Sequence, residues 1–142
     1  MFKNVTEVMY FVSDRRTSAE WYSQLFGIEI TWMKNPEHFF IRVGDQDVWF
    51  HKADSKVPSG ASGHVAYWQV TDFDTMLERA INLGATIYRG PLDREDGYFM
   101  CQVKDLDGNL IGLIDHDQNN FSASIDYGET LANLDVLVDY SF

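Results

Sequence analysis

EVMYFVSD, residues 7–14, returns as VAYWQVTD at residues 65–72, 58 positions further along the chain. Each copy is an apolar run with the alternation of a β-strand, and each ends in Val-x-Asp. A repeat of this kind is considered before any other feature, because it sets the architecture of the whole chain. The sequence therefore predicts two similar units rather than one continuous sheet.

Each copy of the repeat precedes the same series of predicted elements. A helix-like segment ending at a glycine comes next, followed by a β-like stretch at 29–32 in one half and 85–88 in the other. Two further apolar runs complete each half. The predicted fold is therefore α+β, with one βαβββ module over 4–57, a glycine-rich linker over 58–62 and a second module over 63–115.

Helices are predicted over 17–26 and 73–83. Thr17 and Thr75 each stand three residues before a glutamate, which is the spacing of a capping box at the start of a helix. Apolar side chains in both segments recur at the spacing of one helix face, which predicts packing against a core. Left-handed C-terminal caps are expected at two glycines, Gly27 and Gly84.

The composition describes a folded and acidic protein. Of the 142 residues, 45% are hydrophobic and 15% aromatic, which is enough to build a core. The net charge is −11, and none of the 11 basic residues lies beyond residue 104. Phosphate backbones and anionic lipid headgroups repel such a surface, so neither nucleic acid nor a membrane is expected as a partner.

Cysteine use bears on the compartment. Cys101 is the single cysteine, so the chain has no internal disulfide framework, and the cytoplasm is the expected location. No basic residue flanks Cys101, which argues against a reactive thiolate.

The segment 116–142 forms an acidic tail whose end, 131–142, is more apolar. We expect this end to pack on the same subunit or on a partner subunit.

Several of these motifs together carry a family resemblance. The Val-x-Asp strands, the aromatic pair Trp21-Tyr22, the Leu-Phe-Gly27 that ends the first helix, and the closing Asp105-Leu-Asp-Gly-Asn109 are similar to those of the vicinal oxygen chelate superfamily. That superfamily includes glyoxalase I, extradiol dioxygenases, and bleomycin and fosfomycin resistance proteins. The resemblance covers residues 4–115.

The resemblance implies a fold, an assembly and two branches of function. It implies that the curled mixed sheets of the two βαβββ modules enclose a cavity, and that modules pair across the subunits of a homodimer. In one branch the cavity holds a divalent metal that chelates two neighbouring oxygens of the substrate and acts as a Lewis acid. In the other branch, that of drug-binding proteins, it holds an organic ligand without metal.

The metal ligands that the resemblance implies are only partly present. They come from the first and the last strand of each module. Glu7 occupies the first position, whereas the matching position of the second module is Val65, with His64 one residue away. Gly112 stands where the last strand would supply a glutamate, and His51 is the candidate from the other closing strand.

Strand alternation predicts which side chains line the cavity. If the valine of each Val-x-Asp packs against a helix, the other face of each strand lines the cavity. Trp49 with His51, or else Val48 with Phe50, would join from a closing strand, and Arg42 is either an outward charge or an anion-binding group. The candidate ligand-binding residues are Glu7, Met9, Phe11, Arg42, Trp49, His51, Tyr67 and Gln69.

Two function classes follow from this residue set. The favoured class is the binding of a flat or apolar small organic molecule in an aromatic cavity, with no cofactor and no complete metal site. The alternative is a divalent-metal-dependent lyase, isomerase or dioxygenase acting on vicinal oxygens, either a glyoxalase-like lyase or an extradiol-type dioxygenase. In that case Glu7, His51 and His64 would hold the metal. The sequence leaves open whether any reaction is catalysed.

Overall fold

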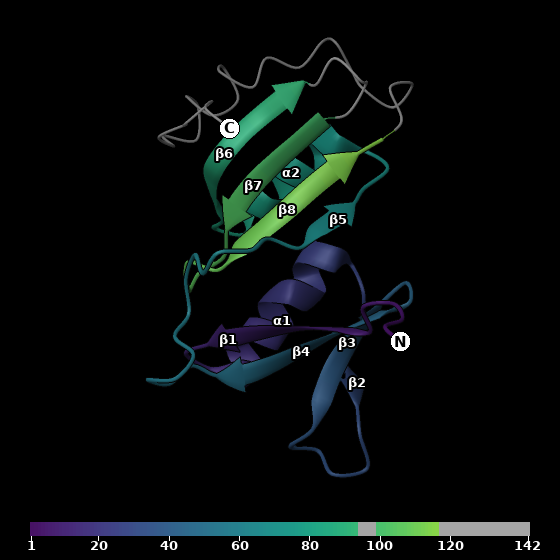
Figure 1. Cartoon of the computed structure of the whole chain (residues 1–142), viewed down its shortest axis with the longest axis vertical. Coiled ribbons are helices and arrows are strands. Elements are labelled where there is room, and N and C mark those ends of the chain that lie inside the picture. The colour runs from purple at the N-terminus through teal and green to yellow at the C-terminus, as the bar shows by residue number, and fades with distance from the viewer. Residues whose placement is uncertain (94–98, 117–142) are drawn as a thin grey trace. The chain divides into compact units, whose positions relative to one another are not determined.

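A computed structural model describes residues 1–93 and 99–116 of the chain (Figure 1). The chain divides after Ser62 into two compact units, and each is described by itself. The predictions made for the tail, that it docks and that its end 131–142 packs on a subunit, lie outside the described residues.

The first unit contains one helix and a mixed four-stranded sheet. The strands are ordered β1-β4-β3-β2, with β1 parallel to β4 and the remaining pairs antiparallel. The elements are β1 (Glu7–Val12), α1 (Arg15–Phe26), β2 (Thr31–Trp32), β3 (Phe39–Val43) and β4 (Gln46–Lys52).

The second unit repeats this arrangement. Its strands are ordered β5-β8-β7-β6, and β5 is parallel to β8. The elements are β5 (Tyr67–Gln69), α2 (Phe73–Asn82), β6 (Thr86–Asp93), β7 (Phe99–Lys104) and β8 (Leu110–Asp115). The prediction of an α+β fold built from two βαβββ modules with mixed sheets is therefore confirmed, and both sheets are open rather than closed on themselves.

The helices begin at the aspartates of the two Val-x-Asp motifs. The carboxylate of Asp14 accepts a hydrogen bond from the backbone N–H of Thr17 at 2.8 Å, and Asp72 accepts one from Thr75 at 3.2 Å. The predicted caps at Thr17 and Thr75 are therefore wrong. Aspartate is among the best N-cap residues, and each aspartate stands where the strand has just ended, so the threonines fall in the first helical turn instead.

The helix ends follow the glycine signal. Gly27 has a φ of 68° and caps α1 in the left-handed conformation. Glycine adopts this conformation at no steric cost because it has no Cβ atom. In α2 the C-cap is Leu83, and Gly84 follows it with a φ of 102°. The predicted glycine position is thus one residue beyond the cap in the second helix.

The helix of each unit packs on one face of its own sheet. In the first unit the ring of Tyr22 from α1, only 1% exposed, lies 4.7 Å from the ring of Tyr10 and 5.3 Å from that of Phe50. In the second unit Phe73 of α2 packs 6.2 Å from Phe99 of β7. These aromatic contacts fill the cores, as predicted for the helical faces, and they define which face of each sheet points away from its helix.

Candidate functional site

The open face of the first sheet, which we define as the face turned away from α1, carries most of the predicted site residues. Tyr10, Val12, Val48 and Phe50 are buried on the helix side. Since side chains alternate along a strand, the residues between them point to the open face. The alternative left open for β4 is resolved: Val48 and Phe50 pack toward α1, so Trp49 shares the open face with its neighbours.

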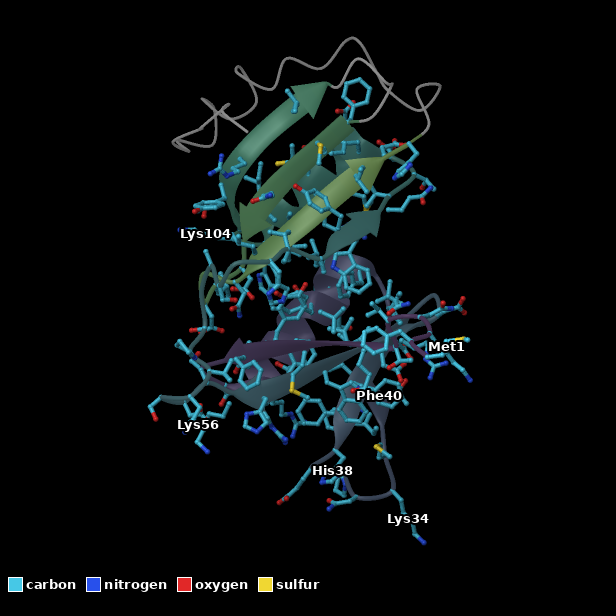
Figure 2. All side chains as sticks on the ribbon, in the orientation of Figure 1. Met1, Lys34, His38, Phe40, Lys56 and Lys104 are labelled. Atoms are coloured by element: carbon cyan, nitrogen blue, oxygen red, sulfur yellow. The ribbon has the colours of Figure 1, made fainter. Side chains whose placement is uncertain are left out.

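The strand register brings the open-face side chains together in pairs. In the parallel pairing of β1 with β4, Met9 is opposite Trp49 and Phe11 is opposite His51. The Phe11 and His51 rings are 5.1 Å apart, and Phe40, labelled in Figure 2, stacks on Trp49 at 4.9 Å. Met9 is 45% exposed. The open face therefore presents a partly exposed apolar and aromatic surface.

Trp49 also brings a polar group to this face. Its indole Nε1 is buried and has no hydrogen-bond partner among the described residues. A buried N–H without an acceptor costs free energy, on the order of 1–3 kcal/mol. The site therefore contains a donor that no residue in the described ranges satisfies.

Charged groups lie at the edge of the same face. Arg42 forms an ion pair with Asp47 through both guanidinium and carboxylate atoms, including an Nη2 to Oδ2 distance of 3.2 Å. The two residues are opposite each other in the β3–β4 register. The guanidinium that the sequence offered as an anion-binding group is thus already held by a carboxylate of the neighbouring strand.

His51 has a defined tautomer. Its Nδ1 lies 2.8 Å from the backbone carbonyl oxygen of Lys52, and because a carbonyl only accepts, Nδ1 carries the proton and donates it. In the neutral ring this leaves Nε2 without a proton. An unprotonated imidazole nitrogen can bind a metal or accept a hydrogen bond. The ring itself is exposed.

The register separates the two metal-ligand candidates of the first unit. Glu7 is opposite Asp47, whereas His51 is opposite Phe11, four residues further along the parallel strands. At about 3.3 Å per residue this places Glu7 and His51 ~13 Å apart along the sheet. Ligands of one ion lie about 2 Å from it, so these two residues do not share an ion within the unit.

The other candidates add no donor cluster. His64 is exposed and precedes β5 in the second unit. Within residues 1–93 and 99–116 there is no group of three or more histidine, cysteine, aspartate or glutamate side chains that could hold a metal ion. Neither unit by itself therefore contains, among its described residues, the complete ligand set that the resemblance implies.

The open face of the second sheet is occupied by Tyr67. Its ring lies across Gly112, its partner in the β5–β8 register, so that a Cβ atom at Gly112 would come within 2.5 Å of the ring. Gln102 from β7 donates a hydrogen bond from Nε2 to the Tyr67 hydroxyl at 2.8 Å. Gln69, two residues along β5, is exposed on the same face. The position where the resemblance implied a glutamate is thus covered by a fixed aromatic ring.

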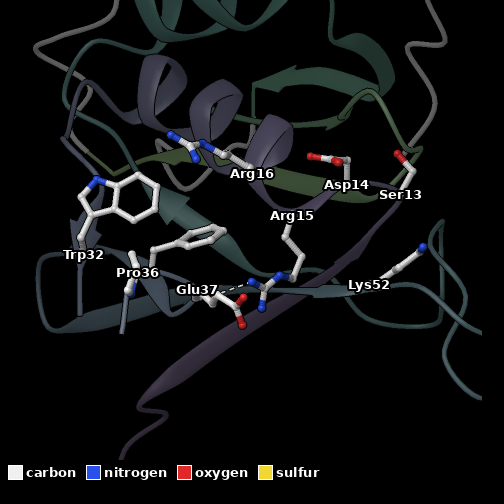
Figure 3. Close-up of a pocket in the computed structure, with 9 residues that line it drawn as sticks. Ser13, Asp14, Arg15, Arg16, Trp32, Pro36, Glu37 and Lys52 are labelled. Carbon is white, nitrogen blue, oxygen red and sulfur yellow. Dashed lines mark hydrogen bonds between the residues drawn. The ribbon is translucent and has the colours of Figure 1, made fainter. Parts of the chain in front are cut away.

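One pocket lies elsewhere and was missed by the sequence reasoning. It is on the helix side of the first sheet, where the start of α1 meets the β2–β3 hairpin (Figure 3). Arg15 and Arg16, directly after the first Val-x-Asp, were the local signal for it. Nothing in the sequence placed Trp32 or Lys52 beside them, because the three segments are distant along the chain.

Cys101 is inert, as its neighbours indicated. Its side chain is fully buried in β7, and burial raises the pKa of its thiol to about 12. At neutral pH the thiolate that would react is therefore scarcely populated. Among the described residues, α1 with 12 residues and α2 with 10 are both too short to span a bilayer.

Two βαβββ units, each with one helix on an open mixed sheet, define a paired-module α+β protein. The model of the Glyoxalase/Bleomycin resistance protein/Dioxygenase superfamily matches residues 4–113, and the chain belongs to this superfamily. No match was found among the curated proteins.

Solved structures share the fold at low sequence identity. An integron cassette protein from the mobile metagenome of V. cholerae is 18% identical, with a TM-score of 0.67 over 82% of this chain and 98% of the other. TioX from Micromonospora sp. ML1 is 22% identical, with a TM-score of 0.63 over 81% and 100%. A family enzyme from Burkholderia phytofirmans PsJN is 15% identical, with a TM-score of 0.67 over 81% and 100%. At these identities the similarity establishes the fold and carries no information about substrates.

Proposed function

We propose that this superfamily member binds a flat or apolar small organic molecule on the open face of its first sheet, without a complete metal site. The observation that carries the proposal is the aromatic surface of that face, where Phe40 stacks on Trp49. The Tyr67 ring across Gly112 in the second unit supports the absence of a complete metal site, because it covers the position where the resemblance implies a carboxylate. The aromatic surface around Trp49 and Phe40 supplies the area that such a ligand would cover.

The open face offers both apolar contact and orientation. Met9, Phe11 and Phe40 present flat or flexible apolar groups. One polar group can orient a ligand: Nε2 of the exposed His51 ring. A few placed polar groups in an apolar surround are typical of small-molecule sites.

We propose that the protein works in the cytoplasm as a homodimer.

Nile red, an uncharged flat dye that fluoresces on apolar surfaces, tests this proposal in the presence of EDTA. We expect saturable binding that weakens about tenfold in Trp49→Ala and less strongly in Met9→Gln. Trp32→Ala is the matched control, because Trp32 is also part-exposed in the same unit but lies on the helix side. Circular dichroism confirms that each variant is folded.

Two results would overturn the proposal. Equal losses in Trp32→Ala and Trp49→Ala would mean that the dye does not report the open face. Near-stoichiometric Zn, Ni, Fe or Mn in the purified protein, together with turnover of a methylglyoxal–glutathione adduct or a catechol, would place it with the metal-dependent lyases, isomerases or dioxygenases instead.

A further inference from the structure

The pocket beside the start of α1 is separate from the open face. It has a volume of about 370 Å³ and is lined from the β1–α1 junction, the β2–β3 hairpin and the end of β4 (Figure 3). Trp32 is opposite the buried Phe39 in the β2–β3 register, and both rings lie on the helix side of the sheet. The two sites are therefore on opposite faces, and this inference goes beyond the proposed function.

Positive charge gathers at this pocket in an otherwise acidic protein. Arg15, Arg16 and Lys52 line it, against the carboxylates of Asp14 and Glu37. The Asp14 carboxylate is engaged as the cap of α1, and its pKa is lowered mainly by the hydrogen bonds from Thr17. At physiological salt, charges more than about 8 Å away are largely screened, so these local cations outweigh the net charge of −11.

Aromatic rings hold the two arginines in place. The Arg15 guanidinium lies 5.0 Å from the centre of the Phe39 ring and donates to the backbone carbonyl oxygen of Glu37 at 2.5 Å. The Arg16 guanidinium lies 5.1 Å from the centre of the Trp32 ring. Stacking of this kind orients a guanidinium while leaving donors at its edge. The entropy lost when these side chains bind an anion is correspondingly reduced.

Arg16 has one competing partner. Its Nε is 3.6 Å from a carboxylate oxygen of Glu20, and both side chains are largely exposed. A surface pair of this kind is worth at most about 1 kcal/mol, so an incoming anion can replace it.

The lining also defines the body of the ligand. Trp32, 44% exposed, and Pro36 form an apolar wall next to the cations. The volume lies at the lower end of the range for small-molecule sites, roughly 300–1,000 Å³. We propose that this pocket binds a small organic carboxylate with a flat apolar body, whose anionic group is held by Arg16, the cation beside Trp32 (Figure 3), and whose body lies against Trp32 and Pro36.

Calorimetric titration with 2-naphthoate tests the proposal, and the uncharged 2-naphthamide is its isosteric control. We expect the acid to bind at least about tenfold more tightly than the amide, and its affinity to fall as salt is raised. Arg16→Gln should weaken naphthoate about fivefold, and Trp32→Ala about tenfold. Inorganic phosphate should compete poorly, because it lacks the apolar body.

The matched control is Lys56→Gln, which makes the same charge change in the loop after β4, outside the pocket (Figure 2). Trp49→Ala is measured beside Trp32→Ala to show whether naphthoate lies on the open face instead of in the pocket. The proposal is overturned if Lys56→Gln weakens binding as much as Arg16→Gln, if the amide binds as well as the acid, or if Trp49→Ala abolishes naphthoate binding while Trp32→Ala does not. The Nile red experiment reports on the opposite face, so either proposal can fail without the other.

Discussion

The ring of Tyr67 lies so close to Gly112 that a Cβ atom at position 112 would come within 2.5 Å of ring atom Cδ1. Real Cβ atoms essentially never approach a neighbour this closely. The Tyr67 hydroxyl is in turn held by Gln102, so the ring cannot simply swing aside without losing a hydrogen bond. Glycine at 112 and tyrosine at 67 therefore depend on each other, at the position where the resemblance implies a carboxylate.

Gly112→Ala should destabilise the protein, since the methyl group and the Tyr67 ring claim the same space. Overpacking of this kind costs about 1–3 kcal/mol, and urea unfolding measures it. In a Tyr67→Ala background the same glycine substitution should cost much less, because the obstructing ring is gone. Equal costs in both backgrounds would show that the ring is not the obstacle.

Gly112→Glu extends this test to metal binding. If the assigned strand position is right, the glutamate should raise metal affinity only in combination with Tyr67→Ala, which clears the open face of the second sheet. Titration with Ni²⁺ or Zn²⁺ measures the change. A gain in affinity in the single variant, with Tyr67 present, would contradict the steric account.

The cap of α1 should make stability depend on pH. The pKa of Asp14 is lowered by its hydrogen bonds from Thr17, so its stabilising effect is complete above its ordinary value of 3.8 and is lost as the pH falls through the lower pKa of the folded state. Asp14→Ala should lower the melting temperature by a few degrees at pH 7, and the gap to the unmodified protein should narrow toward pH 3. Thermal unfolding followed by circular dichroism measures both.

Asp14→Asn is the control for the charge. Asparagine caps helices about as well as aspartate but does not titrate, so this variant should lose less stability than Asp14→Ala at pH 7. Its own stability should show no contribution from position 14 as the pH falls. A gap between aspartate and alanine that stays constant from pH 7 to pH 3 would disprove the assigned role of the carboxylate.

Cys101 should resist thiol reagents while the protein is folded. With its pKa raised to about 12 and its side chain buried, it should react with Ellman's reagent at pH 8 at least a hundredfold more slowly than the thiol of the urea-unfolded chain. Absorbance at the thionitrobenzoate band gives both rates. Comparable rates in the folded and unfolded states would contradict the burial of this strand.

A chain ending at Asp115 should assemble less well than the full chain. The acidic tail carries apolar residues near its end, and their burial on a partner subunit would strengthen a homodimer. We expect the full chain to sediment as a dimer, and the shortened chain to shift toward monomer or to lose solubility. A shortened chain with unchanged mass in sedimentation and unchanged solubility would remove the tail from the assembly.

The sequence by itself determined the repeated βαβββ order and the two faces of each sheet. Both depend on local rules. Alternation along β1 placed Met9 and Phe11 on the face of the sheet that Val12 does not share, and the glycine after α1 marked the end of that helix. The helix caps were assigned three residues too late, at Thr17 and Thr75 instead of Asp14 and Asp72, because threonine and aspartate are both good caps and only the backbone path decides which one precedes the helix.

Only the tertiary structure decided the sites. The register of β1 against β4 separated Glu7 from His51, and that of β5 against β8 set Tyr67 upon Gly112. The pocket at Trp32 and Lys52 likewise joins segments that are distant along the chain. Alternation and capping act between near neighbours and can be read from a single sequence, whereas register and packing are settled by the combined burial of many side chains.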